Sequence, residues 1–391
     1  MAKAISQYNS FTTAEITGSA GSWFLPSSVL IYVDAGAAIN EDNTHADNTI
    51  RIDGRAISSV SDGIHSEGAS SDITVTAQGA VVGATAGVFT SGANESVTNA
   101  GTIDSKGNGI QSSGESLAID NSGAIGGANG VAFTNFGGDI LNRADGVISG
   151  NVAIASAVAD GERLRTVNHG LIVGSTAAYS SLAQGIDVLI NHGTIRGDVN
   201  LGDGDDVFDT RGGKFKGEVS GGDGSDTYFV DRQSTDIVES AKDTGTDLVK
   251  SSLSYTLGTA LENLQLLGTA GHDGFGNGLA NALTGNAGNN TLNGKSGADT
   301  LDGGLGNDSL TGGADADLFA FRTGGGHDTI TDFAAADKID LSGVKGIQNF
   351  SDLKHNHIEE ASDHITIVAG TDQIVLDGVA KSDLSHDQFI F

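Results

Sequence analysis

Apolar and polar residues alternate in short runs through the first half of the chain, and these runs recur at a regular distance. One phrase reads apolar-x-Asn-x-Gly-x-Ile, and its glycines, from Gly79 to Gly193, lie 22 to 24 residues apart. A second phrase, such as GIHSEG or GVFTSG, falls half a repeat away. Two short strand patterns per repeat, each closed by Gly, Asn or Ser, are typical of one coil of a β-solenoid. We therefore predict an all-β fold that begins with a right-handed parallel β-solenoid over residues 41–200.

One asparagine recurs at the same place in each coil. Coils of a solenoid stack at about 4.8 Å, so the same position in successive coils forms a column in which amides hydrogen-bond to each other. We expect such a ladder, and we expect His169 and His192 to stack beside it. The predicted ladder consists of Asn99, Asn121, Asn142, Asn168 and Asn191.

From residue 201 the pattern changes to nine-residue rows of the form G-G-x-G-x-D-x-U-x, where U is a large apolar residue. LGDGDDVFD and GGDGSDTYF come first, and an insert at 230–267 lacks the motif. Five rows then follow in tandem over residues 276–320, and TGGGHDTIT is a further row. Each row predicts a loop of six residues and a strand of three, with two rows per turn. We therefore expect the solenoid to run into a parallel β-roll over residues 201–343.

The apolar content of these rows is too small to hold them folded. One leucine-sized side chain per row contributes about 2 kcal/mol when it is buried. Ordering nine residues costs on the order of 1 kcal/mol or more for each residue. The chain has no cysteine for disulfides or zinc, but it has 50 Asp and Glu residues against 20 Lys and Arg. Carboxylates and backbone carbonyls are the ligands that Ca²⁺ prefers.

The tandem rows resemble the RTX (repeats-in-toxin) family of calcium-binding β-rolls, in which an ion lies between the loops of alternate rows. The resemblance implies Ca²⁺ as the cofactor and pairs Asp299 with Asp317, and Asp308 with Asn290 and Asp328. Asparagine at position six of two rows lowers the charge of those sites, so we expect two to four good tandem sites. The ligand residues implied are Asp203, Asp206, Asp223, Asp226, Gly288, Asn290, Gly297, Asp299, Gly303, Gly304, Gly306, Asp308, Gly312, Gly313, Asp315, Asp317 and Asp328.

The segment HDTITDFAAADKIDLSG resembles the region that closes these rolls. RTX proteins leave Gram-negative bacteria through a type I exporter that reads an uncleaved C-terminal signal. The resemblance therefore implies a secreted protein, extracellular or at the cell surface, with a C-terminal cap and secretion signal at 344–391. The first residues contain no signal-peptide pattern, and no run approaches the ~20 apolar residues of a membrane span. We assign residues 1–40 to an N-terminal cap or assembly strand.

The net charge of −30 excludes nucleic acid as a natural partner, because phosphate binding needs clustered Lys and Arg. The sequence contains no HExxH, GxSxG or P-loop motif, so we predict no catalytic residues and no enzyme. We expect a calcium-binding structural protein that assembles with itself into a filament, surface layer or biofilm matrix. Two alternatives stay open: an adhesin for surface polysaccharide, and a β-helix polysaccharide lyase or epimerase. The loose cluster of Arg143, Arg163, Arg165 and Tyr179 is the candidate site for the latter.

Overall fold

The computed structural model describes residues 3–4, 14–16, 21–232, 235–240, 242 and 245–391. It is almost entirely β-structure in parallel sheets. The chain divides into two compact units, which are described separately. Unit 1 comprises Met1–Asp226 and Thr235–Ile237, and unit 2 comprises Thr227–Ser234 and Val238–Phe391.

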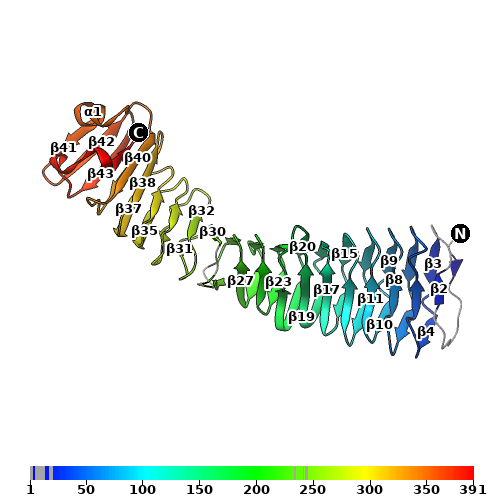
Figure 1. The fold of residues 1–391 in the computed structure, drawn as a ribbon. Helices are drawn as coiled ribbons and strands as arrows, with labels where there is room; N and C mark the ends of the chain where they lie inside the picture. Colours follow the sequence, from blue (N-terminus) through cyan, green and yellow to red (C-terminus); the bar gives the residue numbers. More distant parts are fainter. Residues whose placement is uncertain (1–2, 5–13, 17–20, 233–234, 241, 243–244) are drawn as a thin grey trace. The chain divides into compact units, whose positions relative to one another are not determined.

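Unit 1 is a solenoid in which parallel strands stack coil upon coil in three columns (Figure 1). The first column consists of β1 (Lys3–Ala4), β3 (Ser22–Leu25), β6 (Thr49–Ile52), β9 (Asp72–Val75), β12 (Ser96–Asn99), β15 (Leu117–Asn121), β18 (Gly138–Asn142), β20 (Arg163–Asn168), β22 (Ile186–Asn191) and β25 (Val207–Asp209). The second consists of β4 (Leu30–Val33), β7 (Arg55–Ser58), β10 (Ala80–Gly83), β13 (Thr102–Ser105), β16 (Ala124–Gly126), β23 (Thr194–Arg196) and β26 (Lys214–Lys216). The third consists of β2 (Ala14–Ile16), β5 (Ile39–Glu41), β8 (Ile64–Ser66), β11 (Ala86–Thr90), β14 (Asn108–Ser112), β17 (Asn129–Asn135), β24 (Val199–Asp203), β27 (Glu218–Asp223) and β29 (Asp236–Ile237). The long strands β19 (Val147–Val158) and β21 (Leu171–Ser181) run through both the second and the third column.

Each coil has three strands where the sequence pattern predicted two. The reason is that the phrase apolar-x-Asn-x-Gly-x-Ile contains a turn. In VTNAGTI, β12 ends at Asn99 and β13 begins at Thr102, and the Asn99 side chain accepts a hydrogen bond from the Gly101 N–H at 3.1 Å. This local bond is the Asx type that favours a turn over a continued strand.

The core of unit 1 is a stack of aliphatic side chains, one or two from each strand. In the first column Ile73, Val97, Ile119 and Ile140 lie opposite each other in register, and each is 2% exposed or less. The polar residues between them face outward, which explains the alternation in the sequence. The strands β3, β4 and β5 stack on β6, β7 and β8, so residues 22–41 form a coil of the solenoid. Much of the segment assigned to a cap lies outside the described residues.

The asparagine ladder of unit 1 is confirmed. Each side-chain Nδ2 in the series donates to the Oδ1 of the next asparagine at 2.8 Å. The last member, Asn191, donates to the hydroxyl of Thr210 at 3.3 Å. All five are fully buried, and His169 and His192 stack with ring centroids 5.3 Å apart.

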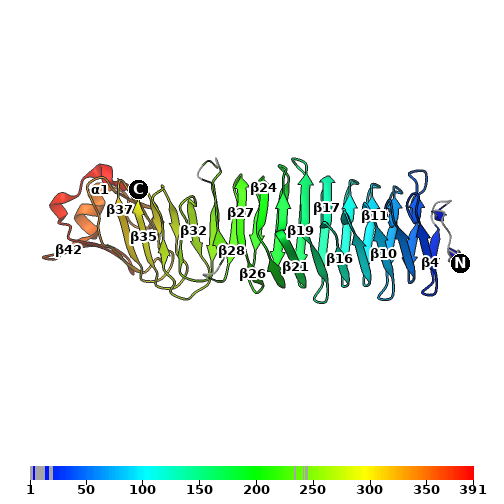
Figure 2. The same ribbon diagram turned by 90° about the horizontal axis from the view of Figure 1, so that it is seen from below.

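Unit 2 has two strand columns, and each turn contributes one strand to each (Figure 2). The first consists of β28 (Thr227–Val230), β30 (Leu248–Ser251), β32 (Asn263–Leu266), β34 (Ala282–Thr284), β36 (Thr300–Asp302), β38 (Leu318–Arg322), β40 (Lys338–Gly343) and β44 (Phe389–Ile390). The second consists of β31 (Tyr255–Thr256), β33 (Gly274–Phe275), β35 (Thr291–Ser296), β37 (Ser309–Ala314), β39 (His327–Ile330) and β43 (Asp372–Asp377), which is followed by antiparallel β42 (His364–Ala369) and β41 (Ile358–Glu360). The C-terminal region also contains α1 (Phe350–Asp352), a π-turn (Leu353–His357) and two 3₁₀ turns (Lys381–Asp383 and His386–Gln388).

The nonapeptide rows form the two faces of the roll, as the sequence predicts. Leu283 lies opposite Leu301 in one column, and Leu292 lies opposite Leu310 in the other. Successive turns are therefore 18 residues apart. The insert at 230–267 is also part of the roll, because β30 and β32 pair in register between β28 and β34. These rungs keep the alternation of buried and outward residues without the glycines of the nonapeptide.

Candidate calcium sites

Position eight of each row fixes the orientation of the loop that precedes it. The side chains of Leu283, Leu292, Leu301, Leu310 and Phe319 are 1% exposed or less and fill the interior of the roll. Because side chains alternate along a strand, position six, two residues earlier, also points inward, at the end of the loop. Position six is a carboxylate or an amide in every tandem row. The fold therefore stacks these polar side chains inside two columns.

The first polar column contains Asn281, Asp299, Asp317 and Asp337. In each step the backbone N–H of one member donates to Oδ1 of the next, at 2.7 Å to Asp299, 2.9 Å to Asp317 and 3.0 Å to Asp337. The pairing of Asp299 with Asp317 that the resemblance implied is therefore present.

The second polar column contains Asn290, Asp308 and Asp328 and has the same pattern. The Asn290 N–H donates to Asp308 Oδ1 at 2.8 Å, and the Asp308 N–H donates to Asp328 Oδ1 at 3.0 Å. Asp308 thus lies between Asn290 and Asp328, as expected. In both columns Oδ1 accepts the backbone hydrogen bond that joins successive loops. Oδ2 takes no part in that bond.

The second oxygen of three aspartates is buried and accepts no hydrogen bond. These atoms are Oδ2 of Asp299, Asp308 and Asp317, whose residues are 1%, 3% and 2% exposed. A carboxylate oxygen removed from water without a donor is strongly destabilised. A bound cation removes that cost, and Ca²⁺ accepts carboxylate and carbonyl oxygens together. The donor set therefore fits calcium.

The first glycine of each row makes room for this oxygen. A Cβ atom on Gly303 or Gly312 would lie 2.3 Å from Oδ2 of Asp308 or Asp317 in the same row. A Cβ on Gly294 would lie 2.1 Å from Asp299 Oδ2 and 2.7 Å from the carbonyl oxygen of Gly312. Carboxylate and backbone oxygens thus converge beside the glycine, and any side chain there would fill the space.

Burial raises the pKa of these carboxyl groups. The pKa of Asp308 rises to about 7, and those of Asp299 and Asp317 rise to about 6, chiefly because burial penalises the charged form. Burial also raises the pKa of Asp328 to about 6. Neighbouring carboxylates add to the effect in each case. A divalent cation supplies the opposite charge that keeps such groups ionised.

Asn290 and Asn281 behave differently from the aspartates. The Asn290 Nδ2 donates to the carbonyl oxygen of His272 at 2.7 Å, and the Asn281 Nδ2 donates to those of Leu261 and Glu262 at 3.1 Å. The carbonyl oxygens that face these rows are therefore bound by an amide nitrogen. The sequence predicted Asn290 as a metal ligand, and its Nδ2 atom bonds the neighbouring loop.

The remaining glycines of the predicted site shape the loops. Gly297, Gly304, Gly306 and Gly313 have φ values between 95° and 117°, which side chains rarely adopt, whereas Gly288 has no such requirement. At position four of its row Asp315 stands at φ 83° instead of glycine. Its carboxylate accepts from the Gly297 N–H at 3.2 Å and is exposed.

The earlier candidate ligands lie in unit 1. Asp206 and Asp226 are each 1% exposed, and the Asp206 N–H donates to Asp226 Oδ1 at 2.8 Å. Asp203 and Asp223 are exposed and lie opposite each other in β24 and β27. Burial raises the pKa of Asp206 to about 9. The buried pair therefore repeats the arrangement of the tandem rows, and the exposed pair lies at the surface beside it.

Of the residues considered for a polysaccharide lyase, Tyr179 lies apart from the arginines, since Arg163 and Arg165 are both on β20. Tyr179 is 1% exposed and donates to Asp187 at 2.6 Å. Arg143 and Arg165 are exposed and pair with Asp120 and Asp139 on the first column of strands. Among the described residues no three His, Cys, Asp or Glu side chains form a compact metal cluster.

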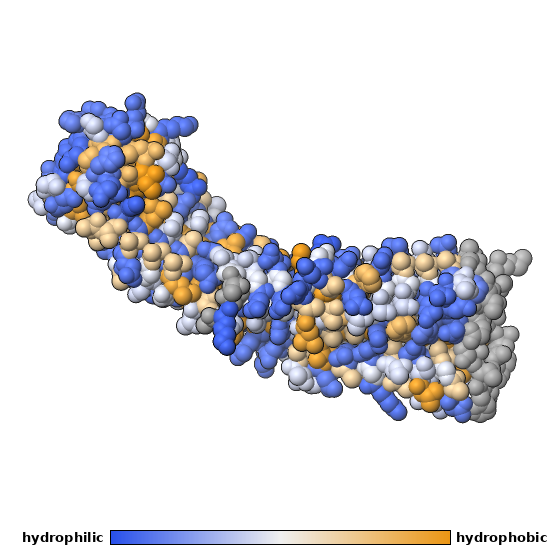
Figure 3. Space-filling view, viewed as in Figure 1, coloured by the Kyte–Doolittle hydropathy of each residue, from blue (hydrophilic) through white to orange (hydrophobic). Residues whose placement is uncertain are grey.

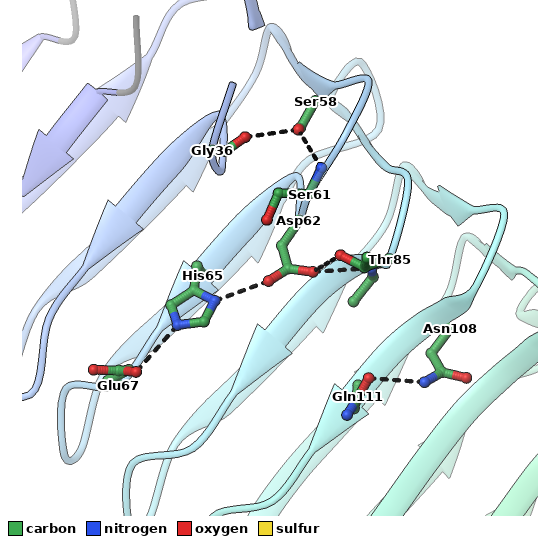
Figure 4. A network of polar contacts seen from close by, with 10 residues as sticks. Gly36, Ser58, Ser61, Asp62, His65, Glu67, Thr85, Asn108 and Gln111 are labelled. Atoms are coloured by element: carbon green, nitrogen blue, oxygen red, sulfur yellow. Dashed lines mark hydrogen bonds and ion pairs between the residues drawn. The ribbon is translucent and has the colours of Figure 1, made fainter. Parts of the chain in front are cut away.

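A second polar network lies on the third strand column of unit 1 (Figure 4). His65 bonds Asp62 at 2.8 Å and Glu67 at 3.2 Å, and its ring stacks on Phe89 at 4.6 Å. Asp62 also accepts from the Thr85 hydroxyl at 2.5 Å. The bond to Asp62 raises the pKa of His65. Both ring nitrogens are engaged, so the network fastens two coils and leaves no nitrogen for catalysis.

A buried carboxyl pair lies near this network. The Ser66 hydroxyl is 2.6 Å from Glu41 Oε2 and 2.5 Å from Glu95 Oε1. One hydroxyl proton cannot serve both contacts, so a second proton belongs to the pair. Burial raises the pKa of Glu95 to about 8, which assigns the proton to Glu95 at neutral pH.

A family model for RTX calcium-binding nonapeptide repeats matches residues 275–319 in four copies. No curated protein matches the chain. Among solved structures, the extracellular lipase LipA from Serratia marcescens is similar at 17% identity and a TM-score of 0.25, over 59% of this chain and 45% of the lipase chain.

Residues 275–319 are RTX repeats, and such repeats bind calcium. They are typical of proteins that leave the cell by type I secretion. In the part of the chain that the structure describes, no helix is long and apolar enough to cross a membrane.

Proposed function

We propose that this chain is a secreted structural protein, that calcium orders its roll outside the cell, and that the ordered protein assembles with its own copies. The product would be an extracellular filament, surface layer or biofilm matrix. The observation that carries the proposal is the set of buried Oδ2 atoms of Asp299, Asp308 and Asp317, which accept no hydrogen bond. Because an unbound buried carboxylate opposes folding, the rows become ordered when calcium is available.

Strand edges support the assembly part of the proposal. Each unit is a stack of parallel strands, and the outermost strand of a stack keeps one edge with unpaired N–H and C=O groups. Among the described residues β4 pairs only with β7. A strand of another copy can add to such an edge. In the face that Figure 3 shows, hydrophilic and hydrophobic residues are interspersed over unit 1.

The C-terminal part of unit 2 suits the export step. Residues 344–391 contain the hairpins of β41, β42 and β43 and the strand β44, which closes the first column on β40. We assign the signal for a type I exporter to this segment. The calcium sites would stay open in the low-calcium cytosol, so the rows would remain unfolded until export was complete.

The test uses the full chain, purified with chelator and then brought to millimolar Ca²⁺. Far-ultraviolet circular dichroism is expected to gain strand signal, and light scattering and electron microscopy are expected to show polymers. Mg²⁺ at the same concentration is the control, because it dehydrates reluctantly and fits these loops poorly. An unchanged dichroism spectrum would refute calcium-dependent ordering. A folded protein that stays monomeric would refute assembly alone.

A groove on unit 1 favours an adhesin as the second candidate. It runs across β12, β15, β18 and β20, and its lining includes Asp120, Asp139 and Arg165 beside Leu141 and Val167. Charged groups over an apolar floor suit the hydroxyls and ring faces of a sugar. A glycan array with calcium-loaded protein tests this reading, and saturable binding that Arg165→Ala abolishes would support it. Release of unsaturated uronates from alginate or pectin would instead favour the lyase.

A further inference from the structure

A third buried aspartate of unit 1 belongs to none of the nonapeptide rows. Asp187 lies in β22, on the coils around β20 and β23 that are green in Figure 1, and it is fully buried. On one side it lies opposite Leu164 of β20. On the other side its N–H donates to Asp206 Oδ1 at 2.7 Å. Asp187 is therefore the first carboxylate of a column that continues through Asp206 to Asp226.

The two carboxylate oxygens of Asp187 differ in hydrogen bonding in the same way as those of the tandem rows. Oδ1 accepts from the Tyr179 hydroxyl at 2.6 Å and from the Ser156 hydroxyl at 3.2 Å, while Oδ2 accepts no hydrogen bond. Asp206 has the same division, with Oδ1 bonded to the Asp187 N–H and Oδ2 buried without a donor. This is the pattern of Asp299 and Asp308. The Tyr179 hydroxyl donates to Oδ1 of Asp187, where a backbone N–H donates to Oδ1 in the tandem rows.

The loop before Asp206 also resembles a matched repeat. Gly202 and Gly204 have φ values of 97° and 127°, close to the 95° and 117° of Gly304 and Gly306 before Asp308. The loop lies directly on the one below, since a Cβ on Gly204 would be 2.7 Å from the carbonyl oxygen of Gly185. Backbone and carboxylate oxygens are thus close together in consecutive coils.

We infer that unit 1 binds a calcium ion of its own at the carboxylates of Asp187 and Asp206, outside the matched repeats. The inference rests on the calcium binding of the proposed function and extends it into the solenoid. The Ser181 hydroxyl also faces Asp187, but Oδ2 of Asp187 and Oδ2 of Asp206 remain buried without a hydrogen bond of normal geometry. Two such adjacent carboxylates need a cation or a proton. Calcium suits them because it takes several oxygens, including backbone carbonyls.

The site would join β21, β22 and the loop before β25. Tyr179 is in β21, Asp187 is in β22, and Asp206 precedes β25. An ion there also fixes β22, the strand that carries Asn191 of the asparagine ladder. Calcium therefore stabilises the last coils of the solenoid as well as the roll.

The first experiment uses Tb³⁺ in place of Ca²⁺ on the full chain. Tyrosine transfers energy to Tb³⁺ only over a few ångströms, and the Tyr179 hydroxyl touches the proposed ligand Asp187. We expect Tyr179→Phe, which keeps both carboxylates, to lose a measurable share of the tyrosine-excited Tb³⁺ emission. Tyr32→Phe is the matched control, since Tyr32 is 40% exposed on β4. Equal emission from both variants would overturn the inference.

The second experiment counts bound calcium by equilibrium dialysis. Asp187→Asn keeps the size and the acceptor for Tyr179 and is expected to bind one ion fewer than the parent chain. Asp120→Asn, at an exposed residue paired with Arg143, is expected to bind the full number. An unchanged count in Asp187→Asn, with unchanged dichroism, would mean that a buried proton alone neutralises the pair.

A third variant separates this inference from the proposed function. Asp308→Asn is expected to lose calcium from unit 2. If Asp308→Asn loses an ion and Asp187→Asn does not, the site in unit 1 is refuted and the roll is unaffected. If neither the parent chain nor any variant binds calcium, the proposed function itself fails. If Asp187→Asn does not fold, the tyrosine-excited Tb³⁺ emission of Tyr179→Phe tests the site instead, because that variant retains Asp187 and Asp206.

Discussion

The asparagine ladder of unit 1 and the aspartate columns of unit 2 solve the same structural problem with different chemistry. Both place one polar side chain per coil in the interior, with an exposure of a few per cent or less. An amide has a donor and an acceptor, so each asparagine satisfies the next at 2.8 Å. A carboxylate has only acceptors, so the aspartate columns leave Oδ2 of Asp299, Asp308 and Asp317 without a hydrogen bond. An aspartate in place of an asparagine has an oxygen where the amide has a nitrogen donor. The stability of a coil with a buried aspartate therefore depends on a bound cation.

The same contrast occurs within the roll. Asn281 and Asn290 begin the two polar columns, and their amide nitrogens bind backbone carbonyl oxygens of the preceding turn. Asp299 and Asp308 follow them with unbound Oδ2 atoms. The tandem rows therefore start with turns that satisfy their own polar groups and continue with turns that require calcium.

Removal of calcium should produce the largest difference in stability between the aspartate columns of unit 2 and the asparagine ladder of unit 1. With chelator, we expect backbone amides of the rows between residues 294 and 331 to lose nearly all protection from hydrogen exchange. Amides of the ladder coils between residues 97 and 168 should keep theirs, because their side chains need no ion. Peptide-resolved exchange measured by mass spectrometry checks this. Equal protection in both regions without calcium would contradict the comparison.

Placing a carboxylate in the ladder should have the next largest effect. Asn142→Asp removes the donor to Asn168 Oδ1 and buries an unpaired charge, which we expect to cost about 3 kcal/mol of the free energy of unfolding. Urea denaturation in the absence of calcium measures it. Asn151→Asp, at an exposed position of β19, is the control and should change stability little. If Asn142→Asp lowered the free energy of unfolding no more than Asn151→Asp does, the hydrogen bonds between the stacked amides would contribute nothing to stability.

Filling the space beside a carboxylate should weaken calcium binding without changing any ligand. In Gly303→Ala the new Cβ would lie 2.3 Å from Asp308 Oδ2, so the oxygen must move. We expect the calcium affinity of that site to fall about tenfold, which corresponds to about 1.4 kcal/mol. Isothermal titration calorimetry checks it. Gly278→Ala is matched to it, since a Cβ there meets nothing within 4 Å, and it should bind as the parent does.

The proton shared with Ser66 makes the stability of unit 1 depend on pH. The pKa of Glu95 rises from 4.5 to about 8 on folding, so the folded state retains a proton that the unfolded chain releases. The stabilisation is complete below pH 4.5 and is lost as the pH rises towards 8, with a slope of at most about 1.4 kcal/mol per pH unit. Glu41 and His65 are the charged groups that face Glu95.

Glu95→Gln mimics the protonated group and should remove this slope. The difference in thermal midpoint between Glu95→Gln and the parent chain, measured from pH 5 to pH 8 without calcium, isolates the effect. Parallel curves for the two proteins would show that Glu95 keeps no proton.

The periodic parts of the molecule could be predicted from the sequence because each coil repeats the same residue at the same place. The asparagine ladder, the inward leucines and the pairing of Asp299 with Asp317 all follow from spacing. The third strand of each coil was missed because its turn lies inside one phrase, at Asn99 and Gly101. The Glu41–Ser66–Glu95 contact has no motif, since its members come from different coils.

Asp187 shows why a site can escape a pattern. Its row lacks the first two glycines of the nonapeptide, and its partner Tyr179 reaches it through space. Only the buried Oδ2 atom reveals the similarity to Asp308.

The amides of Asn281 and Asn290 have a kinetic consequence. A linear array of repeats folds by nucleation at one place and propagation to its neighbours, and the nucleus is the costly step. Because the first tandem rows satisfy their own polar groups, we expect the nucleus to form without waiting for an ion. Calcium then acts on propagation, one turn at a time, and the length of ordered roll follows the free calcium concentration gradually instead of switching at a single threshold.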